Sequence, residues 1–373
     1  MRSIKVGVIG VGFIGAQHID AIHRIPGANI IALAEPFTDV LAAARENFCV
    51  ECGYENWQDL IANPEIQVIH NCTPNHLHDD INRAAIMAGK HIYSEKPLSL
   101  TAKMAHELYI LAGEKNVAHA VNHQYRLNAA VQEMRQRIAG GDCGRTLFIR
   151  GHYLQESHAR KTDYSKRLMP ETSPLRALAD IGTHWADLAC FISGKRIVSV
   201  YADMHTHHPV RIDPQTGNEI PIHSDDTTAV LLRFEDGTPG IMLASKVASG
   251  HKNDIMVSVE GEQCEFTWRQ ELPDRLYVGC REQPNGELFM NPNFTAASTR
   301  PYITTPAGHV MGWSDTLRNA ISSFYTSIWS STYAGSQPYA TFEDGWHTIL
   351  FMEACLLSAR EKRWVNPYEE LMP

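Results

Sequence analysis

The stretch IKVGVIGVGFIGAQH, residues 4–18, decides the fold of the first part of this chain. An apolar β-type run leads into Gly10, Gly12 and Gly15 in G-x-G-x-x-G order, and a helical pattern follows. In this setting Gly10 permits the tight turn, Gly12 lets the backbone approach a pyrophosphate, and Gly15 lets the helix pack closely on its strand. The motif predicts a dinucleotide site at a helix N-terminus, with a ligand-free glycine turn as the alternative.

The second apolar run carries the signal that distinguishes between cofactors. Glu35 ends this run twenty positions after Gly15, where a carboxylate can hold the hydroxyl groups of the adenosine ribose. Pro36 and Phe37 follow it, so a 2'-phosphate would meet a carboxylate without an arginine beside it. We therefore expect NAD as the cofactor and consider NADP the weaker alternative.

Strand and helix patterns alternate through the first third of the chain, which is typical of a parallel sheet covered by helices on both faces. We predict an α/β fold, with a doubly wound Rossmann domain over residues 1–124. The expected strands are 4–10, 29–35, 66–72, 91–95 and 117–123, and the expected helices between them are 38–47, 78–89 and 101–116.

The pattern changes after residue 125, where short strands follow one another with polar turns. We predict a second, α+β domain over residues 125–373 with a large, mostly antiparallel open sheet. Its expected helices are 129–141, 312–331 and 343–361, and its expected strands are 146–155, 196–204, 227–234, 240–247, 254–261, 264–270 and 274–280. Residues 205–226, with Pro and Gly, are the expected long excursion.

Length and charge narrow the class of protein. A chain of 373 residues is expected to form two domains, and 33 Lys and Arg against 42 Asp and Glu give a formal net charge of -9. Without a long basic run, we expect no nucleic-acid partner. The first residues enter a strand pattern directly, and no run is apolar enough for a membrane span, so we expect a soluble cytoplasmic protein.

The eight cysteines are scattered and are expected to be reduced. Cys49 and Cys52 form a C-x-x-C pair, but a zinc site needs a second ligand pair, and a redox pair is expected at a helix start rather than after a helix. We interpret these two cysteines as structural.

Two further sets of polar residues end strands of the first domain. Glu95 and Lys96 follow one strand, and Thr73 and Asn75 follow the preceding one, at the sheet edge where ligands bind in open α/β sheets. Lys96 is placed for chemistry, although an exposed loop lysine is the equal alternative. His78 can reach the same edge or merely begin a helix.

The stretch ADIGTHWADLACF, residues 179–191, places Asp180, His184 and Asp187 at helical spacing. Asp180 can cap the helix N-terminus, and His184 in the first turn would then stay neutral and could act as a base. A metal site is the weaker alternative, because Asp180 and Asp187 lie about 10 Å apart along a helix axis. We expect no metal, and we interpret the His205–His208 run as a solvated loop.

Together, GVIGVGFIGAQH, CTPNHLH, SEKPLSLT, NHQYRLNAAV and ADIGTHWADLACFISG resemble, in order and spacing, the glucose-fructose oxidoreductase, inositol dehydrogenase and rhizopine-catabolism (Gfo/Idh/MocA) family, over nearly the whole chain. The arrangement is most similar to the sugar 3-dehydrogenases of that family. The resemblance implies a Rossmann domain, a substrate domain whose open sheet forms a homodimer or homotetramer, and oxidation of a secondary hydroxyl of a cyclic sugar or polyol.

The resemblance also implies roles for individual residues. Lys96 would stabilise the developing alkoxide, His184 would accept the hydroxyl proton, and Asp180 would orient His184. Arg126, Tyr153 and His309 are weaker substrate candidates beside these three. The expected cofactor contacts are Gly10, Gly12, Phe13, Ile14, Gly15, Glu35, Thr73, Asn75, His78, Glu95, Lys96 and Asn122.

One stretch departs from the family pattern, and two other functions stay open. Residues 173–182, SPLRALADIG, lack the run of glycines that commonly precedes the Asp-Ile-Gly-x-His motif, so the preferred sugar cannot be copied from the family. An NAD-dependent glycosidase that oxidises its sugar transiently would use the same scaffold. A non-catalytic NAD-binding sensor is the third possibility, although Lys96 and His184 are both retained.

Overall fold

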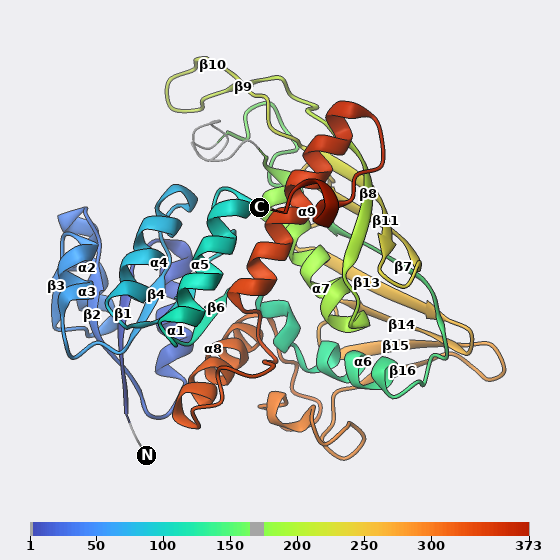
Figure 1. Cartoon of the computed structure of the whole chain (residues 1–373), viewed down its shortest axis with the longest axis horizontal. Coiled ribbons are helices and arrows are strands. Elements are labelled where there is room, and N and C mark those ends of the chain that lie inside the picture. The colour runs from blue at the N-terminus through green and yellow to red at the C-terminus, as the bar shows by residue number, and fades with distance from the viewer. Residues whose placement is uncertain (1–2, 165–174, 373) are drawn as a thin grey trace. The chain divides into compact units, whose positions relative to one another are not determined.

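The computed structural model describes residues 3–164 and 175–372. The chain divides into two compact units, residues 1–127 with 314–347 and residues 128–313 with 348–373 (Figure 1). The first division lies close to the expected boundary at residue 124. The segment 314–347, which we expected in the second domain, instead belongs to the first unit.

The first unit is built on a six-stranded parallel sheet in the order β3-β2-β1-β4-β5-β6. This is the strand order of the doubly wound dinucleotide fold, so the predicted fold of this unit is confirmed. Its strands are β1 (Ile4–Ile9), β2 (Ala28–Ala34), β3 (Cys52–Tyr54), β4 (Val68–Asn71), β5 (His91–Ser94) and β6 (His119–Val121). Its helices are α1 (Phe13–His23), α2 (Thr38–Phe48), α3 (Trp57–Ala62), α4 (His78–Met87), α5 (Ala102–Glu114) and α8 (Trp313–Trp329).

The central strands form the core of this unit because helices cover both faces of the sheet. All four residues of β4 are buried, although two of them, His70 and Asn71, are polar. His70 contacts both His18 of α1 and Tyr325 of α8, so these two helices pack on the same face of the sheet. Strand β3 and helix α3 are short, and neither was predicted from the sequence.

The second unit carries an eight-stranded sheet in the order β16-β15-β14-β13-β7-β12-β11-β8. Neighbouring strands are antiparallel except β7 and β12, which run parallel, so the predicted mostly antiparallel sheet is confirmed. Its strands are β7 (Thr146–Leu154), β8 (Ile197–His205), β11 (Thr227–Phe234), β12 (Pro239–Ser245), β13 (Asp254–Gly261), β14 (Cys264–Arg269), β15 (Arg275–Cys280) and β16 (Gly286–Phe289). Its helices are α6 (Ala129–Ala139), α7 (Thr183–Ser193), the greater part of α9 (Phe342–Glu361) and α10 (Pro367–Glu370).

One face of this sheet is covered by helices and the other carries exposed side chains. Along β11, buried and exposed residues alternate, as expected for a sheet with one packed face. Leu231 of β11 and Ile241 of β12 lie directly opposite each other and are 46% and 41% exposed.

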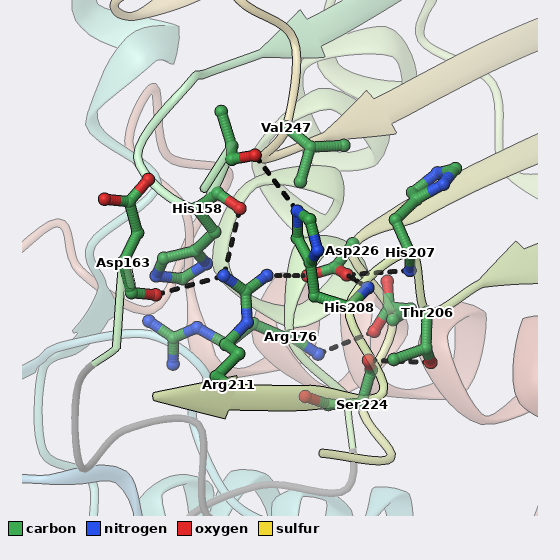
Figure 2. Close-up of polar contacts among 12 residues, drawn as sticks. His158, Asp163, Arg176, Thr206, His207, His208, Arg211, Ser224, Asp226 and Val247 are labelled. Carbon is green, nitrogen blue, oxygen red and sulfur yellow. Dashed lines mark hydrogen bonds and ion pairs between the residues drawn. The ribbon is translucent and has the colours of Figure 1, made fainter. Parts of the chain in front are cut away.

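The expected excursion over residues 205–226 is anchored through a small hairpin. Strands β9 (Val210–Ile212) and β10 (Glu219–Pro221) pair with each other, outside the large sheet. Arg211 of β9 is fully buried, and its guanidinium contacts the Asp226 carboxylate at 2.6 Å. The same guanidinium donates to the carbonyl oxygens of His158 and Asp163 (Figure 2). This buried ion pair therefore fixes three segments to one another.

Among the residues that the structure describes, no helix has the length and apolar character needed to cross a membrane.

Candidate active site

The glycine loop of the first unit has the tight geometry that the motif predicts. Gly10 has a φ of +83°, and a Cβ atom there would lie 2.8 Å from the Cys72 carbonyl oxygen. A Cβ atom on Gly15 would lie 2.0 Å from the Gly10 carbonyl oxygen, so both positions require glycine. A Cβ atom on Gly12 would meet no atom within 4 Å among the described residues. The loop thus leaves open space at Gly12, the position expected to face the pyrophosphate.

Glu35 lies at the end of β2 and is tied to this loop. Its Oε2 accepts a hydrogen bond from the backbone N–H of Val11 at 3.2 Å. The carboxylate therefore sits beside the glycine turn, where a ribose hydroxyl is expected. Phe13 begins α1 with a side chain that is 79% exposed, and Ile14 beside it is half-buried. These residues fit a dinucleotide, and their individual contacts with it stay predictions.

The loop after β4 is held by its own side chains. Thr73 donates from Oγ1 to the Asn71 carboxamide at 2.7 Å, and Asn75 begins a single 3-10 turn. His78 is buried, with Nε2 at 2.8 Å from the Thr73 carbonyl oxygen and Nδ1 at 2.7 Å from the Pro97 carbonyl oxygen. The His78 ring therefore joins the loops that follow β4 and β5, and its contact with the cofactor stays a prediction.

Glu95 and Lys96 follow β5, and their side chains differ in environment. Glu95 is buried, and its Oε2 accepts from the backbone N–H of Lys96 at 3.1 Å. Its Oε1 accepts from the Asn122 amide at 2.5 Å and contacts His18 Nε2 at 3.1 Å. Lys96 is half-buried at the carboxyl edge of the sheet. The structure thus brings Glu95, Lys96 and Asn122 together, and it adds His18, which no sequence motif predicted.

Arg126, a predicted substrate residue, lies in the first unit just before its boundary. Its guanidinium is buried and contacts the Asp344 carboxylate at 2.8 Å. Burial would raise the pKa of the Asp344 carboxyl, but the charge and hydrogen bond of Arg126 and two hydrogen bonds from Thr341 lower it to about 2. Arg126 is thus partly engaged in a structural ion pair, and its contact with substrate stays a prediction.

In the second unit, Asp180 and His184 share one continuous helical segment. Residues Leu178–Gly182 form a π-helical turn that runs directly into α7. The alternative in which Asp180 caps the helix is wrong, because Asp180 lies inside this segment. The carboxylate of Asp225 takes the capping role, accepting from the backbone N–H groups of Arg176 at 2.6 Å and Leu178 at 2.8 Å. His184 is therefore preceded by a full turn, and the first-turn argument for its neutral form is lost.

Two cations hold the Asp180 carboxylate. Its Oδ2 lies 2.5 Å from an Arg176 guanidinium nitrogen and 2.7 Å from the Lys246 ammonium. The Arg176 contact has i,i+4 spacing, which the sequence shows, but Lys246 comes from the end of β12 and carries no local signal. Residues 173 and 174 of the stretch that departs from the family pattern lie outside the described residues. The departure nonetheless contains Arg176, which pairs with a predicted site residue.

His184 lies beside Tyr153 in the second unit. The rings of Tyr153 and His184 lie 6.3 Å apart between centroids, and both residues are buried. Tyr153 donates from its hydroxyl to the Asn253 carboxamide at 2.5 Å.

His309, another predicted substrate residue, is exposed in a turn closed by a hydrogen bond from Thr305 Oγ1 to its carbonyl oxygen.

A third histidine, His158, lies among the cations of this unit. Burial and the charges of Lys246, Arg176 and Arg211 lower the pKa of His158 to about 3, so its imidazole is neutral. Figure 2 shows its ring beside the Arg211 guanidinium. His208, from the run expected to be a solvated loop, contacts the Ala159 carbonyl oxygen with Nε2 at 3.0 Å.

Within residues 3–164 and 175–372, no group of three or more His, Cys, Asp or Glu side chains is arranged to hold a metal ion. Cys49 and Cys52 are both free thiols, the first exposed and the second half-buried. The expected absence of a metal and the structural role of these cysteines stay predictions.

Two family models match the chain. Residues 4–123 match an oxidoreductase family described as an NAD-binding Rossmann fold, and residues 131–267 match the GFO/IDH/MocA C-terminal domain. The predicted NAD-binding Rossmann domain is thereby confirmed, as is the family resemblance.

Similar proteins include enzymes that act on cyclic sugars and polyols. Levoglucosan dehydrogenase of Pseudarthrobacter phenanthrenivorans is 30% identical over 98% of each chain. A structure of levoglucosan dehydrogenase in complex with NADH and L-sorbose matches with a TM-score of 0.90 and 29% identity, covering 98% of this chain and 99% of that one. Myo-inositol 2-dehydrogenase of Thermotoga maritima is 24% identical over 66% of this chain and 69% of its own.

Proposed function

Because the chain belongs to the Gfo/Idh/MocA family of NAD-binding oxidoreductases, we propose that it oxidises a secondary hydroxyl group of a cyclic sugar or polyol. The observation that carries the proposal is the helical segment with Asp180 and His184, since it offers a base and a paired carboxylate in a chain that binds NAD. The sugar and polyol dehydrogenases among the similar proteins support the substrate class.

Oxidation of an alcohol removes a hydride from its carbon and a proton from its hydroxyl group. The C–H hydride leaves for the nicotinamide, which bound NAD supplies as the hydride acceptor, and the hydroxyl proton leaves for a base. An alcohol is far too weak an acid to lose that proton unaided at neutral pH. His184 accepts the proton in this proposal, and the Lys96 ammonium stabilises the negative charge that develops on the oxygen.

Asp180 has a more specific role here than a simple partner of His184. As an ionised carboxylate it favours the imidazolium that forms when His184 takes the proton. Arg176 and Lys246 offset part of its charge, so in this proposal its attraction for the imidazolium is weaker than that of an isolated carboxylate.

The proposal is tested by NADH fluorescence with the purified protein, NAD or NADP, and a panel of anhydrosugars, inositols and aldoses. We expect NADH to accumulate with at least one member of the panel. The variants Lys96→Met and His184→Asn should each lower kcat/KM by about 100-fold or more while still binding NADH. Activity that persists unchanged in both variants would remove the assigned roles.

The NAD-dependent glycosidase is a separate outcome of the same experiment. Such an enzyme returns the hydride to its substrate, so it would release the leaving group of a chromogenic glycoside without net NADH. NADH binding with neither reaction would indicate a sensor.

The exposed face of the eight-stranded sheet supports a second part of the proposal, assembly into a homodimer or homotetramer. Leu231, Ile241 and Leu243 are between 38% and 46% exposed on adjacent strands. Contiguous apolar side chains of this kind mark protein interfaces. We propose that a second copy of the chain covers them.

A further inference from the structure

Four buried polar side chains form a continuous hydrogen-bonded chain behind Lys96, which we call the Glu95 relay: Glu95, His18, His70 and Tyr325. Glu95 Oε1 lies 3.1 Å from His18 Nε2, and His18 Nδ1 lies 2.9 Å from His70 Nδ1. His70 Nε2 then lies 2.7 Å from the Tyr325 hydroxyl. All four belong to the first unit, so their arrangement depends on this unit alone.

The positions of the protons in the Glu95 relay follow from the burial and the hydrogen-bond partners of its side chains. Burial and the neighbouring His18 hold the pKa of His70 well below its usual range, so this ring is neutral. Burial raises the pKa of Tyr325, so its hydroxyl keeps its proton. The contact between the two Nδ1 atoms holds one proton. His18 donates from Nε2 to Glu95, because the carboxylate oxygen is the acceptor.

Glu95 is therefore an ionised carboxylate fixed in the interior. Burial would raise its pKa, but the hydrogen bond and charge of His18, the charge of Lys96 and the Asn122 hydrogen bond lower it to about 2. Both oxygens are used, one by His18 and Asn122 and the other by the backbone N–H of Lys96. The carboxylate thus touches the backbone of Lys96 directly, while its own position depends on His18.

We propose that Glu95 is a positioning residue for Lys96: its carboxylate fixes the backbone that carries the lysine, and its charge favours the ammonium form. The inference deepens the proposed function, because it explains how Lys96 stays cationic at the site. The attraction that lowers the pKa of Glu95 acts equally on Lys96, since the two opposite charges stabilise each other. The other titratable groups that the Glu95 charge reaches are Cys72 in the loop after β4, His78 of α4 and Tyr93 of β5.

Two substitutions of Glu95 separate the effect of its charge from the effect of its side-chain shape. Glu95→Gln keeps the shape but removes the charge and leaves one acceptor oxygen where two are used. Glu95→Asp keeps the charge but withdraws it by one methylene. The titration of Lys96 is measured on the full chain by pH-dependent acetylation followed by peptide mass spectrometry, which needs no turnover. Asp79→Asn is the matched control, because Asp79 is also a buried carboxylate of this unit and is hydrogen-bonded to Ser99 and Arg83.

We expect Glu95→Gln to move the titration of Lys96 to lower pH by about one unit or more. The basic limb of the kcat/KM profile should move in the same direction, because activity requires the ammonium. Glu95→Asp and Asp79→Asn should keep the wild-type titration, and Glu95→Asp should lose about 10-fold in kcat through misplacement of Lys96. A wild-type titration of Lys96 in Glu95→Gln overturns the proposal.

A second pair of variants tests the relay if Glu95→Gln does not fold. His18→Gln keeps a nitrogen donor toward Glu95, whereas His18→Leu removes it. We expect His18→Leu to lose about 10-fold in kcat with little change in KM, and His18→Gln to restore most of that loss. Equal kcat in the two variants contradicts the relay.

The two proposals can fail separately. If no polyol is oxidised but Glu95→Gln still shifts the titration of Lys96, the proposed dehydrogenase function fails and the positioning role stands. If a polyol is oxidised and the titration does not move, the reverse holds.

Discussion

The ammonium group of Lys246, at the end of β12, lies 2.7 Å from the carboxylate of Asp180 in the π-helical turn before α7. Arg176 approaches the same carboxylate oxygen at 2.5 Å, so two cations share one anion. Asp180 is therefore a less effective partner for an imidazolium than an isolated carboxylate would be. This arrangement distinguishes the site from a simple Asp–His pair.

The first prediction concerns Lys246. Lys246→Gln removes a positive charge beside Asp180, so the imidazolium form of His184 becomes more favourable. The acid limb of the kcat/KM profile should then move to higher pH by about half a unit to one unit. The measurement is the pH profile of the variant beside that of Lys195→Gln, since Lys195 is a half-buried lysine of the same unit that pairs with Asp236. An unchanged acid limb would show that Lys246 does not act on the base.

The second prediction compares two glycines of one loop. Gly12→Ala places its Cβ in open space, so the free energy of unfolding should change by less than about 1 kcal/mol while NADH binding weakens at least about 10-fold. Gly15→Ala forces a Cβ against the Gly10 carbonyl and should destabilise the protein by more than about 2 kcal/mol. Urea unfolding and NADH fluorescence titration measure both effects. Tight NADH binding by Gly12→Ala would contradict the assigned position of the pyrophosphate.

The third prediction concerns acid stability. Burial, partly opposed by the charge of Asp344, lowers the pKa of His119 to about 4, and its Nδ1 accepts the backbone N–H of Phe342 at 3.0 Å. The unfolded chain binds a proton at this residue below about pH 6.5, but the folded chain does not until about pH 4. Its contribution therefore lowers the free energy of unfolding as the pH falls through this window, by up to about 3 kcal/mol.

His119→Asn keeps an acceptor for Phe342 and does not titrate. Urea unfolding at several pH values should give a shallower acid loss for this variant than for the wild type. Parallel curves for the two proteins would rule out the contribution of His119.

The fourth prediction tests the exposed sheet face. The double variant Leu231→Glu, Ile241→Glu places charges on two facing residues of β11 and β12, and light scattering should show dissociation to monomers. Leu272→Glu is the matched control, since Leu272 is 45% exposed but lies between β14 and β15, outside the strands of the sheet. Assemblies that withstand the double variant would place the interface elsewhere.

Much of the fold was predictable because its signals are local. The glycine loop, the buried parallel strands and the long terminal helices each carry a pattern within a few residues, and their positions were predicted within a few residues. Strand β3 and helix α3 are too short for a clear periodicity. The placement of residues 314–347 in the first unit depends on contacts such as Tyr325 with His70, which no local pattern contains.

The candidate site shows the same division. Glu35, Lys96, Asp180 and His184 follow from motifs, but Lys246, which pairs with Asp180, and His18, which contacts Glu95, are distant from them in the sequence. Asp225 caps a helix that begins almost fifty residues earlier, and it displaces Asp180 from the role that its local sequence suggested. His18 of α1 contacts Glu95, although no sequence motif beside either residue predicts this contact.

The most direct test of the central claim follows the transferred hydrogen. The protein is incubated with NAD and a cyclic polyol that carries deuterium on its ring carbons, and the NADH formed is analysed by mass spectrometry. We expect wild-type protein to yield NADH with one deuterium, and the yield to fall by about 100-fold or more in His184→Asn. Unlabelled NADH, or an equal yield of deuterated NADH from wild type and His184→Asn, would contradict oxidation of a ring hydroxyl with His184 as the base.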